Sequence, residues 1–315
     1  MTLALALVAL TLALPWGAAA ATRGLAALLP PREACAALTS AAVLLAGGTV
    51  AALIGLLHVP FLAALERIPP ARAAAEWPAA VPVSAAAGAA LAFQAVRTTR
   101  RWFAYRSVLA RAWASTSDAV SDGDLLVVTD GGPRAYALPA WCGHAGRVVV
   151  TTGMLRTLGR AEREVLLGHE RAHLRGRHHL LSLAVDLAAA VHPALRSLRP
   201  ALDFHLERWA DESAASAVGD RRLTATAIAR AALAASTAEK RPENRGPLLT
   251  VGTGPVPQRV EALLRPVPLR PRSHRTRAAL AGLVTAVSVS APSGLVLAYW
   301  LHEYVELTAR ALLAD

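Results

Sequence analysis

Long apolar stretches alternate with shorter polar ones along this chain. Three of them are free enough of charge to cross a bilayer core of about 30 Å, which needs roughly 20 helical residues. They are residues 1–22, 36–65 (with the span itself expected at 36–57) and 278–300. A fourth stretch, residues 77–96, also contains no charge. This pattern predicts a mainly α membrane protein with about four transmembrane helices.

Arginines gather beside these stretches, and by the positive-inside rule they mark the cytoplasmic side. Five follow the third span and five precede the last: Arg97, Arg100, Arg101, Arg106, Arg111, and Arg265, Arg270, Arg272, Arg275, Arg277. The predicted topology has the N-terminus outside, residues 23–35 inside, 66–76 outside, 97–277 inside and the C-terminus outside. The first stretch ends in WGAAAA, which also suits a signal-peptide cleavage region; its lack of a charged n-region favours a retained span.

The predicted organisation therefore has four parts. They are an N-terminal membrane region (1–96), a cytoplasmic domain inserted between the spans (97–277), a final transmembrane helix (278–300) and a short extracytoplasmic tail (301–315). We expect a multi-pass protein of the plasma membrane.

The composition agrees with a membrane protein and indicates which kinds of partner the chain binds. Hydrophobic residues make up 54% of the chain and charged residues 17%. The net charge of +11 comes from arginines beside the spans, with no single basic patch interleaved with aromatics, so we expect the lipid bilayer and not nucleic acid as a partner. A single lysine, Lys240, among many arginines suggests a GC-rich, bacterial genome. Cys35 and Cys142 show no pairing or metal spacing.

Within the inserted segment the pattern predicts an α+β domain. A helix follows the third span, with apolar residues at helical spacing from Trp102 to Trp113. Short β-branched runs divided by Gly and Pro predict a small sheet. These runs are residues 124–130, 131–140 and 146–153. Helices are expected from Gly159 onward, over Leu202–Val218 and over Leu223–Ala238, while Leu180–Leu195 is either a core helix or one lying against the membrane.

The stretch GHERAH, residues 168–173, carries the strongest chemical signal. Residues four apart share one helical face, so His169 and His173 can bind one metal ion with Glu170 beside them. This is the HExxH motif of zinc metalloproteases, in which the glutamate acts as general base. The competing interpretation is a polar turn of an ordinary helix. The apolar residues Val165 to Leu167 favour a buried helix, whose histidines need partners.

A third ligand is expected from HLERWAD, residues 205–211. Glu207 and Asp211 again share a helical face, so Glu207 can bind the metal while Asp211 hydrogen-bonds to a ligand histidine. Alternatively, the two carboxylates lie on a solvated face and pair with Arg208 or Arg221. His205 is a rival ligand on another side of this helix.

HERAH followed by ERWAD resembles the HExxH and ExxxD pair of gluzincin metallopeptidases, specifically the integral-membrane group with the HtpX-type proteases and the BlaR/MecR-type antirepressor peptidases. Three spans before the domain and one after it look more like the BlaR/MecR type. The chain departs from that type after the last span, where residues 301–315 are too few for a penicillin-binding sensor domain, so we expect that domain to be lacking. The resemblance implies one Zn²⁺ per chain, bound by His169, His173 and Glu207. It further implies that Glu170 acts as general base and acid, and that Asp211 lies behind the metal ligands and contacts one of them without binding the metal itself.

His178 matches a histidine frequent in the HtpX-like group and is a candidate for a place behind the ligands, with a helix-end histidine of no function as the alternative. A protein substrate, such as a repressor or a misfolded membrane protein, is expected to pair with an exposed strand. GRVVVTT is the predicted strand, with Arg147, Val148, Val149 and Val150.

A non-proteolytic regulator that keeps the fold is the alternative function, whereas a transporter would need more ionisable groups within the spans than His58 alone. The oligomeric state is left open.

Overall fold

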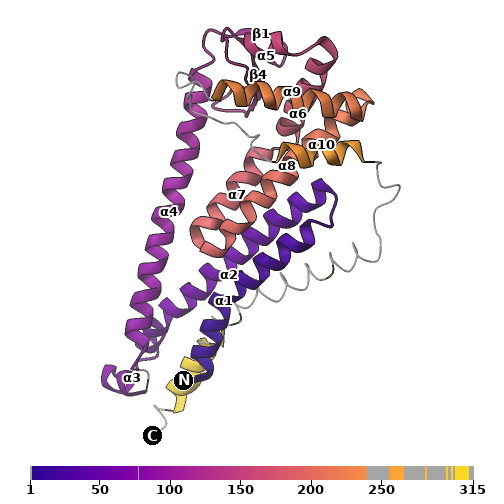
Figure 1. Ribbon diagram of the computed structural model, residues 1–315. Coiled ribbons are helices and arrows are strands. Elements are labelled where there is room, and N and C mark those ends of the chain that lie inside the picture. The colour runs from indigo at the N-terminus through magenta and orange to yellow at the C-terminus, as the bar shows by residue number, and fades with distance from the viewer. Residues whose placement is uncertain are drawn as a thin grey trace.

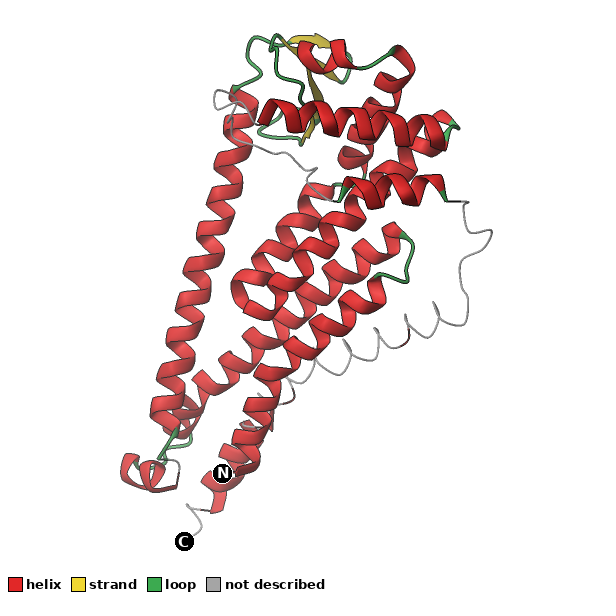
Figure 2. Ribbon diagram, in the orientation of Figure 1, coloured by secondary structure: helices red, strands yellow, loops and turns green. Residues whose placement is uncertain are grey.

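The computed structural model describes residues 2–76, 78–239, 255–265, 281, 296, 299–300 and 302–311. Helices dominate this part of the chain, and one small sheet lies at the end of the molecule far from both termini (Figure 2). The predicted final span, 278–300, falls largely outside the described residues.

Two helices in the described part are long and apolar enough to cross a membrane, α2 (Pro31–Leu65) and α4 (Ala80–Ala114). Each has 35 residues, and at 1.5 Å per residue each is about 52 Å long, well beyond a hydrocarbon core of about 30 Å. They meet near the short α3 (Pro70–Glu76), where Ser84 Oγ donates to Leu57 O at 2.9 Å. From there they diverge toward the sheet (Figure 1). Helix α1 (Thr2–Ala26) runs beside α2.

The far end of α4 supports the sheet, as expected for a helix that continues past the third span. Leu109 and Ala112 are buried there against Leu126, Leu138 and Val149. Trp113 Nε1 also donates to Pro139 O at 2.9 Å. The helical spacing of apolar residues from Tyr105 to Trp113 is thereby explained as one packing face, whereas Trp102 lies outside it and is 41% exposed.

The sheet has four strands in the order β1-β2-β4-β3. Three of them were predicted: β2 (Leu125–Val128), β3 (Ala135–Leu138) and β4 (Arg147–Thr151). The short β1 (Val120–Asp122) was not. β1 and β2 form an antiparallel hairpin, β2 and β4 are parallel, and β3 pairs with β4 antiparallel.

The prediction that Arg147, Val148, Val149 and Val150 form an exposed edge strand is wrong. β4 is hydrogen-bonded to β2 on one side and to β3 on the other, so it has no free backbone edge. Its three valines are at most 1% exposed. A run of β-branched apolar residues marks a strand buried on both faces, whereas edges are kept short or polar. The edge on this side of the sheet is β3, which contacts the helix that carries GHERAH.

The remaining helices lie beside and below the sheet (Figure 1). The predicted start at Gly159 is confirmed, because the Glu162 carboxylate accepts a hydrogen bond from Gly159 N–H at 2.8 Å. The elements are α5 (Thr152–Thr157), α6 (Arg160–Arg175), α7 (His178–Val191), the 3-10 turn η1 (Pro193–Ser197), α8 (Leu198–Val218), α9 (Arg221–Glu239) and α10 (Val256–Leu264).

One hydrophobic core joins α7 and α8 to the N-terminal helices. Buried residues of α1 and α2, such as Leu38 and Leu45, pack in the same cluster as Val185, Leu202 and Leu206. The segment predicted as either a core or a membrane-lying helix thus packs one face into this core, and its contact with the membrane stays a prediction. The boundary drawn between residues 96 and 97 stays a prediction, and this core extends across it.

Candidate metal centre

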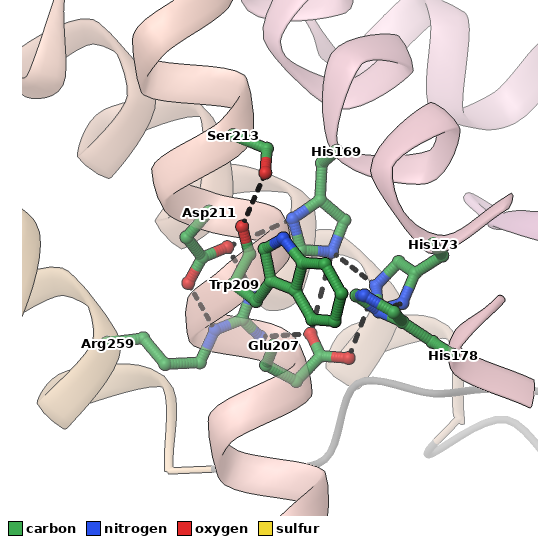
Figure 3. Close-up of polar contacts among 8 residues, drawn as sticks. All are labelled: His169, His173, His178, Glu207, Trp209, Asp211, Ser213 and Arg259. Atoms are coloured by element: carbon green, nitrogen blue, oxygen red, sulfur yellow. Dashed lines mark hydrogen bonds and ion pairs between the residues drawn. The ribbon is translucent and has the colours of Figure 1, made fainter. Parts of the chain in front are cut away.

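Two crossing helices, α6 and α8, form the site. His169 and His173 lie one turn apart on α6, and their rings point toward α8 (Figure 3). Their Nε2 atoms are 3.1 Å apart. Both residues are buried. The sequence places them together because residues four apart fall on one helical face.

Glu207 of α8 meets both rings. Its Oε2 lies 3.5 Å from His169 Nε2 and its Oε1 lies 3.4 Å from His173 Nε2. The three residues offer ligand atoms that all lie within 4.8 Å of one another. Two imidazoles and one carboxylate are a donor set of catalytic zinc sites. Glu207 Oε1 is buried and makes no hydrogen bond in the described part of the chain, so the residues present fit such an ion.

Asp211 lies one turn beyond Glu207 and reaches the outer nitrogen of His169, with Oδ1 3.0 Å from Nδ1. A carboxylate at this nitrogen orients the ring and leaves Nε2 as the one free to bind a metal. The structure therefore brings together the four residues that the sequence proposed as ligands and as the group behind them.

Arg259 of α10 completes the cluster and was missed in the sequence. Its guanidinium forms a two-bond pair with Asp211, Nε to Oδ2 at 2.7 Å and Nη2 to Oδ1 at 2.6 Å. Its Nη1 lies 2.9 Å from Glu207 Oε2. The side chain is almost fully buried. A signal was present: Val256, Arg259, Val260 and Leu263 follow the i, i+3, i+4, i+7 pattern of a buried helical stripe, and arginine is the exception in it.

The alternative pairing of the carboxylates with Arg208 or Arg221 does not occur. Both arginines instead pair with Glu212, which lies elsewhere on α8. His205, the rival ligand, is buried but does not belong to the metal-ligand group; its ring contacts Phe204.

Glu170 is buried beside the ligands, and its environment suits a proton carrier. Burial raises the pKa of its carboxyl to about 7, although His169 nearby works the other way. The backbone N–H of Ala137, in edge strand β3, hydrogen-bonds to the carboxylate. A group with a pKa near neutrality can both take up and release a proton under physiological conditions.

The pKa values of the two histidines and the two acids are shifted in different directions by their surroundings. Burial lowers the pKa of His173 to about 3. For His169 burial also disfavours the charged ring, but the contacts with Asp211 and Glu207 outweigh it and raise the pKa to about 10. Burial opposes ionisation of Glu207 and Asp211, yet contacts with His169 and Arg259 lower the pKa of both carboxyls. The two acids therefore remain negative.

Comparison with known proteins gives one match. Residues 106–205 match the family model described as Peptidase family M48, from the end of α4 through the sheet and GHERAH into α8. No curated protein and no solved structure matches the chain. Residues 106–205 are therefore similar to the M48 peptidase family, which agrees with the metallopeptidase motif in the sequence. The match ends two residues before Glu207, so the third ligand rests on geometry, and the match does not separate the HtpX type from the BlaR/MecR type.

Removal of Arg259 is expected to destabilise the protein strongly. Arg259→Met would leave two buried carboxylates without their counter-charge, and breaking a buried ion pair in this way costs about 3–5 kcal/mol. Thermal unfolding in detergent with excess chelator should show a large loss in melting temperature, and added zinc should reduce the deficit because it also supplies positive charge. Arg265→Met on the same helix, where the side chain is 71% exposed, is the matched control. Equal losses in the two variants would contradict this role.

A second prediction concerns Glu170 and pH. The unfolded carboxyl ionises near 4.5, whereas the folded one stays protonated to about 7. The folded state therefore loses stability as pH rises through this window, and glutamine does not suffer the loss. With chelator present, we expect Glu170→Gln to exceed wild type by on the order of 3 kcal/mol above pH 7, the difference fading toward pH 4. Melting curves at several pH values would test this, with exposed Glu261→Gln as control. A gain independent of pH would refute the cause given.

Proposed function

We propose that the protein is a membrane-anchored zinc-dependent endopeptidase. The observation that carries this proposal is the convergence of His169, His173 and Glu207 beside the buried Glu170, in a chain with an M48 peptidase segment. Zinc bound there would act as a Lewis acid toward a scissile carbonyl and an attacking water.

The chain's own residues supply the rest of the chemistry. The Glu170 carboxylate takes the proton of the attacking water and returns a proton to the leaving amine, a dual role that suits a pKa near 7. Asp211, held by Arg259, has its Oδ1 3.0 Å from His169 Nδ1, where it would hold the proton of that nitrogen and keep the opposite nitrogen free for the metal.

Edge strand β3 is the proposed binding surface for an extended peptide. Arg134 directly precedes β3 in the chain, and its carbonyl accepts a hydrogen bond from Thr151 N–H of β4 at 3.0 Å. The backbone groups of Arg134 therefore point toward β4. By the alternation of an antiparallel ladder, the backbone groups of Ala135 and Ala137 then point away from β4. Ala137 N–H already contacts Glu170, so a peptide added to this edge would run past the general base. Such pairing holds a substrate through its backbone.

The proposed orientation places the site in the cytoplasm. Arg100, Arg101 and Arg106 are exposed on the part of α4 between its apolar half and the sheet, which supports an inside location by the positive-inside rule. The four-span topology in the plasma membrane is part of the proposal. A cytoplasmic repressor or a misfolded membrane protein remains the proposed substrate.

Glu170→Gln separates a peptidase from a non-proteolytic regulator. With purified protein in detergent, we expect wild type to bind about one zinc per chain and to cleave labelled unstructured protein such as casein. Glu170→Gln should keep zinc and lose cleavage by at least about a hundredfold, the lower range for a general base. Glu207→Ala should lose zinc. Absence of zinc from folded wild type would overturn the peptidase proposal, and equal cleavage by wild type and Glu170→Gln would remove Glu170 from the mechanism.

The β3 edge generates a separate prediction. Ala135→Pro removes one outward N–H without removing a ladder bond to β4, so it should raise KM for protein substrates severalfold and leave zinc content unchanged. Ser121→Pro in β1, on the opposite edge of the sheet, is the matched control and should leave KM unaltered. The same KM change in both variants would indicate general damage to the sheet and argue against the edge as a binding surface.

A further inference from the structure

His178 lies behind the metal ligands, although it comes from a different helix. After α6 the chain turns at Gly176 and at Arg177, whose φ of 49° is in the left-handed region. Helix α7 then begins with His178. The turn brings the His178 ring back onto His173, with Nδ1 to Nδ1 at 2.7 Å and the rings at 88° (Figure 3).

The short distance between these two nitrogens constrains where the protons lie. His173 directs Nε2 toward Glu207 and His169, and a nitrogen that binds a metal must carry a free lone pair. The His173 proton is then on Nδ1, and it is donated to the Nδ1 lone pair of His178. His178 must in turn carry its own proton on Nε2. Its Nε2 is buried without a hydrogen-bond partner in the described part of the chain, so the ring is held there by packing.

Two neighbours fix the ring of His178. Trp209 of α8 lies against it, with ring centroids 4.5 Å apart. On another side is Gly176, where an added Cβ would lie 2.4 Å from His178 Nε2. Glycine is needed here for space and not for its backbone freedom, since its φ is −76°. Trp209 is itself contacted by the guanidinium of Arg32 at the start of α2, 5.7 Å from the ring centroid.

We propose that His178 is a positioning residue that fixes the tautomer and orientation of the metal ligand His173, and that Trp209 holds the His178 ring in place. This inference rests on the proposed zinc function and deepens it. Asp211 serves His169 in the same way from α8. Each histidine ligand thus has its own acceptor, a carboxylate for one and an imidazole for the other.

A packing role alone would require only the volume of the ring, so the test must vary the acceptor. In His178→Asn the amide oxygen falls close to the position of Nδ1 and can accept the His173 proton. In His178→Leu the acceptor is lost. Zinc affinity would be measured in purified detergent-solubilised protein by competition with a chelator. We expect His178→Leu to weaken zinc binding about 10–100-fold, the usual effect of removing a group that orients a ligand, and His178→Asn to stay near wild type.

The neighbouring His179→Leu is the matched control, because His179 is only partly buried and should leave affinity unchanged. If His178→Leu fails to fold, His178→Gln replaces it, since its amide oxygen lies one bond too far out. Trp209→Phe should retain affinity and Trp209→Ala should lose part of it. Equal affinity of the Leu, Gln and Asn variants would overturn the proposal, whether all match wild type or all fall together. No zinc in wild type would instead overturn the proposed function itself.

Discussion

Negative charge buried at one point is the constraint on which this structure depends. Glu207 and Asp211 are both about 2% exposed at their side chains, and Glu170 lies beside them. Burying carboxylates without partners is costly, so the fold must bring positive charge to them. Arg259 supplies one positive charge from α10. The two histidines, one of which can be protonated, offer a second position where positive charge, and so a divalent cation, is favoured. His169, His173 and Glu207 could therefore hold a cation at this point, as proposed above.

This requirement explains why helices far apart in sequence meet here. α6 provides the imidazoles and Glu170, α8 provides the two acids, and α10 provides the arginine. α8 performs two tasks along its length. Its first turns pack Leu198, Leu202 and Leu206 against the N-terminal helices, and its next turn presents Glu207 to the histidines. The position of Glu207, the proposed third ligand, is therefore set by the same core that anchors α1 and α2.

The part of the site that follows from local spacing could be predicted. His169 with His173 and Glu207 with Asp211 each share a helical face because of the 3.6-residue repeat, and no knowledge of the tertiary fold is needed to place each pair. The edge strand could not be predicted in the same way. The valine run of β4 is typical of a strand buried between two others, but which of the remaining strands forms the edge depends on the strand order, which local patterns do not give. Arg259 depends on the return of α10 across 48 residues to Asp211, which local patterns do not encode. Its position in an apolar stripe was the available sign.

The sheet, the helices and the helix start at Gly159 followed from periodicity and turn residues, whereas the final span and the topology as a whole are still predictions.

The core shared by α1, α2, α7 and α8 also determines what counts as a folding unit. A segment beginning at residue 97 would contain every proposed ligand, yet it would leave Val185, Leu198, Leu202 and Leu206 without the helices that cover them. Contiguous apolar surface of this kind drives self-association in water. The peptidase segment is therefore not an independent module tethered to an anchor. The N-terminal helices form part of the wall that keeps its ligand-bearing helix folded.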